Sequence, residues 1–150
     1  MLHLRFCSLS VVLLGLPLVG CGPDDGAGTA PASATVTLDG EPIEGVTVTL
    51  IPEGTSVKGK GGYGVTDASG SVTFKTGPET DGVVPGKYRV LFQKLTQADG
   101  SPIPPDAMAI DIETVNAVPA IYNDSENSPI LATIDEGGSS GPMTFELRSR

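Results

Sequence analysis

The stretch Thr35-Val-Thr-Leu-Asp-Gly-Glu-Pro-Ile-Glu-Gly-Val-Thr-Val-Thr-Leu-Ile-Pro52 decides the fold prediction. Its first four residues alternate hydroxyl and aliphatic side chains, and its second half places Val46, Val48 and Leu50 on one face of an extended chain. Asp39-Gly40 is a turn signal, because Gly accepts a positive φ at no steric cost. The stretch therefore predicts two β-strands joined by a tight turn.

The same alternation continues along the chain between turn signals. The predicted strands are Thr35 to Leu38, Val46 to Pro52, Tyr63 to Thr66, Ser71 to Thr76, Lys87 to Leu95, Ile130 to Ile134 and Met143 to Leu147. No connector has the apolar period of a crossover helix, so antiparallel connections are expected. With 20 Gly and 13 Pro in 150 residues, the sequence indicates an all-β sandwich or barrel of short strands.

The composition limits both the core and the partners. Trp is absent and aromatic residues make up 5%, so the core rests on Val, Ile and Leu, with Phe74, Phe92 and Phe145 as larger fillers. A chain that starts at Cys21 has 8 basic and 18 acidic residues, a net charge of -10. Such a surface repels phosphate backbones, and we expect no nucleic-acid binding.

The N-terminus has the three-part layout of a secretory signal, with Arg5 before an apolar run from Leu9 to Val19. The run is too short to span a bilayer. The last two residues of the run and the two that follow it, Leu18-Val19-Gly20-Cys21, resemble the lipobox of bacterial lipoproteins. The resemblance implies cleavage before Cys21 and acylation of its sulfur and new amino group. The alternatives are an ordinary signal peptide with a coincidental Cys, or a buried hydrophobic strand.

Acylation would attach the chain to a membrane without spanning it. Gly22 follows the cysteine, where Asp favours inner-membrane retention in well-studied envelopes, so we expect an outer-membrane lipoprotein of the cell envelope. Gly22 to Ala34 holds no large apolar side chain and is predicted to be a flexible tether that adds nothing to a core. The predicted organisation is a signal peptide over 1–20, a tether over 21–34 and one domain over 35–150.

Three stretches together resemble the carboxypeptidase regulatory-like, or transthyretin-like, domain of many bacterial surface lipoproteins. They are Val36 to Leu50, Thr66-Asp-Ala-Ser-Gly-Ser-Val-Thr-Phe74, and Val84-Pro-Gly-Lys-Tyr-Arg-Val90. The segment Val118-Pro-Ala-Ile-Tyr-Asn-Asp124 is similar to a Pro-x-x-Tyr segment of those proteins, except that Ile121 replaces a common Lys or Arg. The resemblance implies an antiparallel seven-stranded β-sandwich of transthyretin-like or Ig-like architecture, usually without an assigned activity.

Histidine and cysteine are nearly absent. His3 and Cys7 lie in the predicted signal peptide, and Cys21 would be acylated. The mature chain would then lack the imidazole and the free thiol that nucleophilic catalysis and transition-metal sites use. This also argues against the hydroxyisourate hydrolases related to transthyretin, whose site depends on histidines. Gly59-Lys60-Gly61-Gly62 lacks the spacing of a phosphate loop, and we expect a chain that is not an enzyme and holds no cofactor.

Carboxylate side chains are the remaining candidates for a metal-binding or catalytic site. Two groups could supply oxygen ligands to Ca²⁺, and they are Asp39, Asp67 and Ser69 in turns, and Asp124, Glu126 and Asn127 in the late part of the chain. The favoured reading is that these side chains cap turns. A carboxylate pair for glycoside hydrolysis is not excluded by spacing. Tyr63 and Tyr88 are predicted to be half-buried, and Lys58 and Lys60 to be solvated.

The late segment, Thr96 to Pro129, has the weakest pattern. Met108, Ile110 and Ile112 alternate as in a strand, but prolines flank them. Structureless connections of this length are uncommon in compact domains unless they are functional or disordered. We therefore expect a monomeric, membrane-anchored interaction or structural module, with an envelope protein or a glycan as its partner. The alternative is a carbohydrate- or Ca²⁺-binding module that uses the late segment.

Overall fold

The structure is a computed structural model that describes residues 28–54, 61–78, 80–104, 106–107, 113–138 and 141–149. The predicted signal peptide with Cys21, the lysines Lys58 and Lys60, and the alternating run from Met108 to Ile112 lie outside the described residues. Within the described ranges, no helix is long and apolar enough to cross a membrane.

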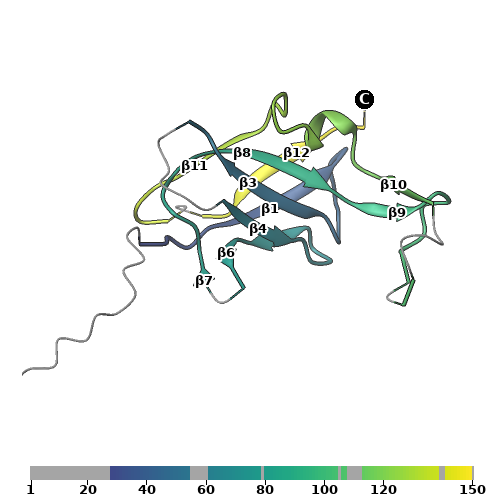
Figure 1. Ribbon diagram of the computed structural model, residues 1–150, viewed down its shortest axis with the longest axis horizontal. Coiled ribbons are helices and arrows are strands. Elements are labelled where there is room, and N and C mark those ends of the chain that lie inside the picture. Colours follow the sequence, from purple (N-terminus) through teal and green to yellow (C-terminus); the bar gives the residue numbers. More distant parts are fainter. Residues whose placement is uncertain are drawn as a thin grey trace, which may run out of the picture.

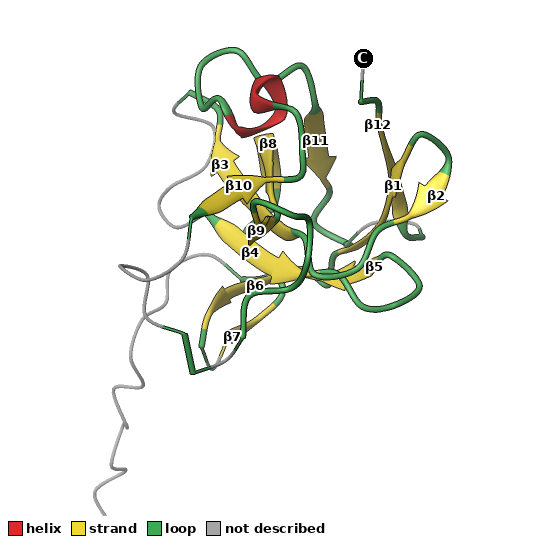
Figure 2. Ribbon diagram, turned by 90° about the vertical axis from the view of Figure 1, so that its right-hand side faces the viewer, coloured by secondary structure: helices red, strands yellow, loops and turns green. Residues whose placement is uncertain are grey.

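The chain folds into two β-sheets around one core (Figures 1 and 2). The larger, six-stranded sheet has the order β11-β8-β3-β4-β6-β7 and consists of β3 (Thr47–Pro52), β4 (Gly62–Val65), β6 (Lys75–Gly77), β7 (Thr80–Asp81), β8 (Gly86–Gln93) and β11 (Leu131–Ile134). The smaller sheet has the order β12-β1-β2, with β5 also paired to β1, and consists of β1 (Ser33–Leu38), β2 (Glu41–Pro42), β5 (Ser71–Thr73) and β12 (Met143–Leu147). The predicted all-β sandwich is thus confirmed.

A two-stranded ribbon extends from one end of the sandwich (Figure 1). It is formed by β9 (Leu95–Gln97) and β10 (Thr114–Asn116), and the short 3-10 helix η1 (Ala120–Asn123) follows it. The described residues contain twelve strands rather than the predicted seven. One reason is that the predicted strand from Ser71 to Thr76 is two strands, because the chain leaves the smaller sheet and joins the larger one at Phe74.

The predicted inward faces are confirmed by burial. Side chains alternate between buried and outward positions along β3 and β8, as the period of two requires. The fully buried large side chains are Val36, Val46, Val48, Leu50, Val72, Phe74, Val83, Tyr88, Val90, Phe92, Ile134 and Leu147. They come from both sheets, so burial of apolar surface between the layers stabilises the fold.

The predicted opening hairpin is wrong in one respect: its two strands lie in different sheets. The turn at Asp39-Gly40 does reverse the chain, with φ of 53° and 92°, but it leads only into the two-residue strand β2. The chain then crosses to the larger sheet, and the buried Thr66 fixes this crossing. Its hydroxyl donates to the Ile43 carbonyl at 2.7 Å and accepts from the Val46 amide at 2.9 Å.

The first and last strands, β1 and β12, pair in parallel, from Ala34 beside Met143 to Leu38 beside Leu147. The expectation of antiparallel connections is therefore wrong for this pair, whereas the other strand pairs of the described residues are antiparallel. A parallel pair requires a long connection. Here almost the whole domain supplies it.

The end of the predicted tether belongs to the core. Ala30, Ala32 and Ala34 are at most 3% exposed. The Ala30 amide donates to the Val83 carbonyl at 2.7 Å, and the Val83 amide donates back at 3.0 Å. The prediction that residues up to Ala34 add nothing to a core is thus wrong for these alanines, whose small side chains fit where the chain enters between the sheets.

Candidate functional site

The late segment is folded over much of its length. β9 and β10 form its ribbon, and Asn116 fastens the ribbon's base. The Oδ1 atom of Asn116 accepts from the Lys94 amide at 2.9 Å and from the Val118 amide at 3.2 Å, and the Ala117 amide donates to the Lys94 carbonyl at 2.8 Å. The ribbon therefore leaves and re-enters the sandwich at one fixed point.

Helix η1 is held against the end of the sandwich by Tyr122. The Tyr122 ring lies edge-on to Phe92 at 6.3 Å between centroids, and Phe92 lies edge-on to Phe145 of the smaller sheet at 5.5 Å. The Tyr122 hydroxyl accepts from the Arg148 amide at 3.2 Å. Ile121, one residue earlier in the Pro-x-x-Tyr segment, is 54% exposed. Tyr122 thus holds η1 while Ile121 is presented to solvent.

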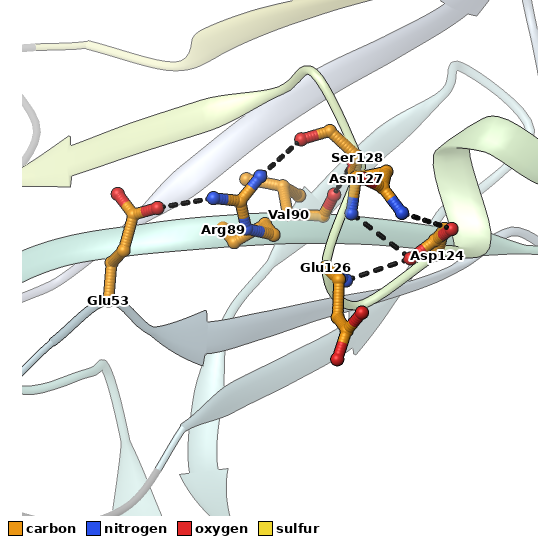
Figure 3. A network of polar contacts seen from close by, with 7 residues as sticks. All are labelled: Glu53, Arg89, Val90, Asp124, Glu126, Asn127 and Ser128. Atoms are coloured by element: carbon orange, nitrogen blue, oxygen red, sulfur yellow. Dashed lines mark hydrogen bonds and ion pairs between the residues drawn. The ribbon is translucent and has the colours of Figure 1, made fainter.

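Arg89 joins three parts of the chain (Figure 3). It lies on the outward face of β8, and its guanidinium donates to the Glu53 carboxylate at 2.5 Å and to the Ser128 carbonyl at 2.7 Å. The Arg89 side chain is 24% exposed and the Glu53 side chain 37%. Charge-assisted bonds at such partly buried positions are stronger than bonds between neutral groups. Arg89 therefore fastens the end of the late segment to the end of β3.

Ser128 anchors the same segment from the other side. It is fully buried, and its hydroxyl donates to the Val90 carbonyl at 2.7 Å. Its amide donates to the Asp124 carbonyl at 2.9 Å. Arg89 and Ser128 were not singled out by the sequence. A cation between Tyr88 and Val90 in a strand, and a serine directly before a proline and β11, are the signals that could have found them.

Asp124 caps the turn between η1 and Ser128. Its Oδ1 atom accepts from the Glu126 amide at 2.8 Å and from the Asn127 amide at 3.0 Å, and its Oδ2 atom accepts from the Asn127 side chain at 2.9 Å (Figure 3). These bonds, led by the one from the Asn127 side chain, lower the pKa of Asp124. The structure therefore brings Asp124, Glu126 and Asn127 together as a turn.

Of the other predicted oxygen ligands, Asp67 caps its turn with Ser69, whereas Asp39 bonds to the distant C-terminal segment. Asp67 accepts from the Ser69 amide and hydroxyl and from the Ser71 amide, and Asp39 accepts from the Ser149 amide at 3.0 Å. The hydrogen bonds lower the pKa of both carboxyls, those from Ser69 and Ser149 contributing most. Across the described parts of the chain, no three His, Cys, Asp or Glu side chains lie close enough together to hold a metal ion.

The two tyrosines predicted to be half-buried differ from each other. Tyr88 is fully buried, its hydroxyl donates to the Val84 carbonyl, and burial raises its pKa. Tyr63 is 43% exposed on the outward side of β4. The prediction is therefore wrong for Tyr88, because β8 lies between β3 and β11 and its inward side faces the core, and Tyr63 is more exposed than predicted.

A shallow groove of about 710 Å³ lies beside η1, and we call it the pole groove. Its lining residues are Asn116, Ala117, Val118, Pro119, Ala120, Asn123, Asp124 and Ser149. Amide, carboxylate and hydroxyl groups stand beside small apolar side chains in this set. The groove can therefore exchange hydrogen bonds with a polar ligand or with a partner's backbone, and Arg89, Ser128 and Tyr122 hold its walls in place.

Arg89→Ala is expected to destabilise the protein by about 1–2 kcal/mol, since it removes two charge-assisted bonds at a partly buried site. From the strand alternation alone, the same change would be mild. Urea unfolding measures the loss, and amide hydrogen exchange at Asn127 and Ser128 should speed up in the folded protein. Lys87→Ala, at the next outward and exposed position of β8, is the control. Equal effects at the two positions would contradict a fastening role for Arg89.

Asp67→Ala is expected to cost stability at neutral pH but not in acid. The turn lowers the pKa of Asp67 below its ordinary value of 3.8, so the stabilisation is complete above that value and is lost as the pH falls through the folded-state pKa. The difference in melting temperature between wild type and variant should be constant from about pH 7 to pH 5 and shrink below about pH 4. A difference that stays constant into acid would contradict the role of the charge.

Comparisons with known proteins identify no family. No protein-family model matches the chain, and no curated protein matches it. A solved structure that matches is that of a 9R-lipoxygenase from Cyanothece PCC8801, at 14% identity and a TM-score of 0.36. The match spans 80% of this chain and 16% of the lipoxygenase chain.

The expectation that the chain is not an enzyme is withdrawn, since it rested on the absence of histidine and of a free thiol from the predicted mature chain. The matched structure is an enzyme, but at a TM-score of 0.36 it carries no argument about this chain. The likeness is too weak to assign a lipoxygenase activity to this chain.

Proposed function

We propose that the chain is a lipoprotein of the cell envelope, anchored through acylated Cys21, whose carboxypeptidase regulatory-like β-sandwich is a protein-interaction module. The four residues Leu18 to Cys21 support the anchor, and the fold class agrees with the proposed domain type. The outer membrane is the proposed location, since Gly22 rather than Asp follows the cysteine.

The arrangement of the two ends is the observation that carries the proposal. The described chain begins at one end of the sandwich, where Thr29 donates to the Asp81 carbonyl and Ala30 pairs with Val83. The ribbon, η1 and the C-terminus lie at the other end (Figure 1). An anchor that precedes Thr29 would therefore hold one end near the membrane and leave the pole groove free to meet a partner.

Cys21→Ser is expected to abolish lipidation, because the cysteine sulfur is the proposed acceptor of the first acyl group. The variant should incorporate no labelled fatty acid and should keep its signal peptide, which labelling of cells and gel mobility measure. Cys7→Ser changes the other cysteine of the chain and should behave as wild type. Fatty-acid incorporation into the Cys21→Ser variant, or none into the wild type, would refute the anchor.

The interaction module is tested at the pole groove. A photo-crosslinking amino acid at Ile121, which is exposed beside the groove, should capture a defined protein in intact cells. The same residue at Thr144, on the outward side of β12, should not. Capture from both positions or from neither would speak against the groove as the binding surface.

Carbohydrate binding at the pole groove is a second candidate function. The volume of about 710 Å³ is in the range of small-molecule sites, and the lining offers Asn116, Asn123, Asp124 and Ser149 to hydroxyl groups. A glycan that binds the folded state should raise the melting temperature by mass action. Asn123→Ala should remove the increase, and Gln93→Ala, on the outward side of β8, should not. Unchanged melting with envelope glycans would remove this candidate.

A further inference from the structure

The outward side of the larger sheet has an unusual composition, and we call it the outer face. Its side chains come from alternate positions of β3, β4, β6, β8 and β11. The members used below are the apolar Ile51, Tyr63, Val65, Leu91 and Leu131 and the basic Lys75, Lys87 and Arg89. The strand register places Leu131, Arg89 and Ile51 in one row and Leu91, Thr49, Tyr63 and Lys75 in the next.

Apolar side chains are exposed on the outer face. Leu131 is 57% exposed, Val65 59% and Tyr63 43%, while Ile51 and Leu91 beside them are half-buried. A one-sided antiparallel sheet ordinarily turns polar residues toward water. A group of large apolar side chains on such a side marks an interaction surface.

The five strands of the outer face and the four strands of the smaller sheet carry charges of opposite sign. The five strands that form the outer face contain Lys75, Lys87 and Arg89 and no acidic residue, although the whole chain has a net charge of -9. The smaller sheet contains Glu41 and Glu146 and no basic residue. Acidic residues border the outer face: Asp81 of β7, the sixth strand of the same sheet, pairs with Lys75, Glu53 pairs with Arg89, and Asp67 lines one pocket with Tyr63, Val65 and Lys75. The strands of the outer face itself carry only cations, so this is the side of the acidic protein that can approach an anionic surface.

The chain enters the sandwich at the edge of this sheet. Thr29 and Ala30 bond to Asp81 and Val83, and Lys75 of β6 bridges to Gly82 and forms an ion pair with Asp81 at 3.2 Å. Ala30 is nine residues after Cys21, a reach of at most about 32 Å. The four strand spacings from β6 to β11 cover about 19 Å. A lipid anchor at Cys21 thus leaves the whole outer face within reach of the bilayer.

We propose that the outer face lies on the surface of the membrane that holds the anchor, with its apolar side chains at the level of anionic lipid headgroups and its cations beside their phosphates. This inference rests on the proposed anchor. Juxtamembrane cations are attracted to an anionic surface, and a short tether raises the effective concentration to the millimolar range. Contacts that are too weak to bind a protein without an anchor are therefore sufficient to hold the outer face on the bilayer. In this orientation the smaller sheet, with Glu41 and Glu146, faces away from the lipid.

A single tryptophan reports the orientation, because the natural chain has none. The full-length lipidated protein is reconstituted into vesicles of equal parts phosphatidylglycerol and phosphatidylcholine, with the phosphatidylcholine brominated near the headgroup end of its acyl chains. Leu131→Trp should lose about half of its fluorescence relative to unbrominated vesicles. Thr144→Trp, on the outward side of the smaller sheet, is the matched control and should lose little.

Adding Lys87→Glu to the Leu131→Trp protein should reduce the quenching. The reduction in quenching should be smaller in vesicles of pure phosphatidylcholine. Equal quenching of the two tryptophans, or none at Leu131→Trp in a protein that floats with the vesicles, overturns the orientation. Crosslinked oligomers without quenching overturn it in favour of contact between copies. A wild-type protein that does not float lacks the anchor itself, and that result refutes the proposed function together with this inference.

Discussion

Replacing Phe92 by alanine is expected to lower the free energy of unfolding by about 3–5 kcal/mol, which is the usual cost of removing a buried aromatic side chain. Phe92 is fully buried and contacts the rings of Phe145 in the opposite sheet and Tyr122 in the late segment. The cavity would therefore open where both sheets and η1 meet. Urea unfolding followed by far-UV circular dichroism measures the loss.

Gln93→Ala, one residue along β8 and exposed on the outer side, is the control and should change stability by less than about 0.5 kcal/mol. In the Phe92→Ala protein, amides of η1 should also exchange faster than in wild type, since Tyr122 loses its ring partner. Similar losses at both positions would contradict the assignment of inward and outward faces to β8.

A chain that starts at Thr35 is expected to be less stable than one that starts at Gly28 by about 4 kcal/mol. The shorter chain loses the buried side chains of Ala30, Ala32 and Ala34 and the two hydrogen bonds between Ala30 and Val83. Thermal unfolding should show a melting temperature lower by about 10 °C or more.

Two substitutions separate packing from chain length in this comparison. Ala32→Asp places an unpaired charge at a position that is 3% exposed, and it should destabilise the longer chain as strongly as the truncation does. Ser33→Asp, one residue later on the outward side of β1, should be tolerated. Equal melting temperatures of the two chain lengths would restore the view that residues up to Ala34 are only a tether.

The sequence predicts which way a side chain points better than which sheet its strand joins. The alternation at Val46, Val48 and Leu50 places all three correctly, because the period of a strand fixes its faces wherever one side is buried. Layer membership is set by the packing of the whole chain. For that reason β1 and β3, the two strands that the opening stretch predicts as a hairpin, lie in opposite sheets although they are close in sequence.

The burial of the small alanine side chains and the partners of the long Arg89 side chain were harder to predict from the sequence. Ala30, Ala32 and Ala34 bury too little surface each to stand out as core residues, and their burial follows from where the chain enters the sandwich. The period of the predicted strand from Lys87 to Leu95 makes Arg89 outward, but its partners Glu53 and Ser128 are 36 and 39 residues away. A long-range contact of this kind has no signal in the local pattern. The turn role of Asp67 and Asp124 is local, and the structure has both residues in that role.

The parallel pairing of β1 with β12 determines how the domain resists being pulled. A load between a membrane anchor at the N-terminus and a partner near the C-terminus draws these two strands past each other lengthwise. Their five paired positions, Ala34 with Met143 through Leu38 with Leu147, then bear the load in shear, because the evenly spaced slanted bonds of a parallel pair stretch together instead of opening one after another. If the chain is anchored and bound as proposed, this parallel pair would resist a pulling force directed along the strands.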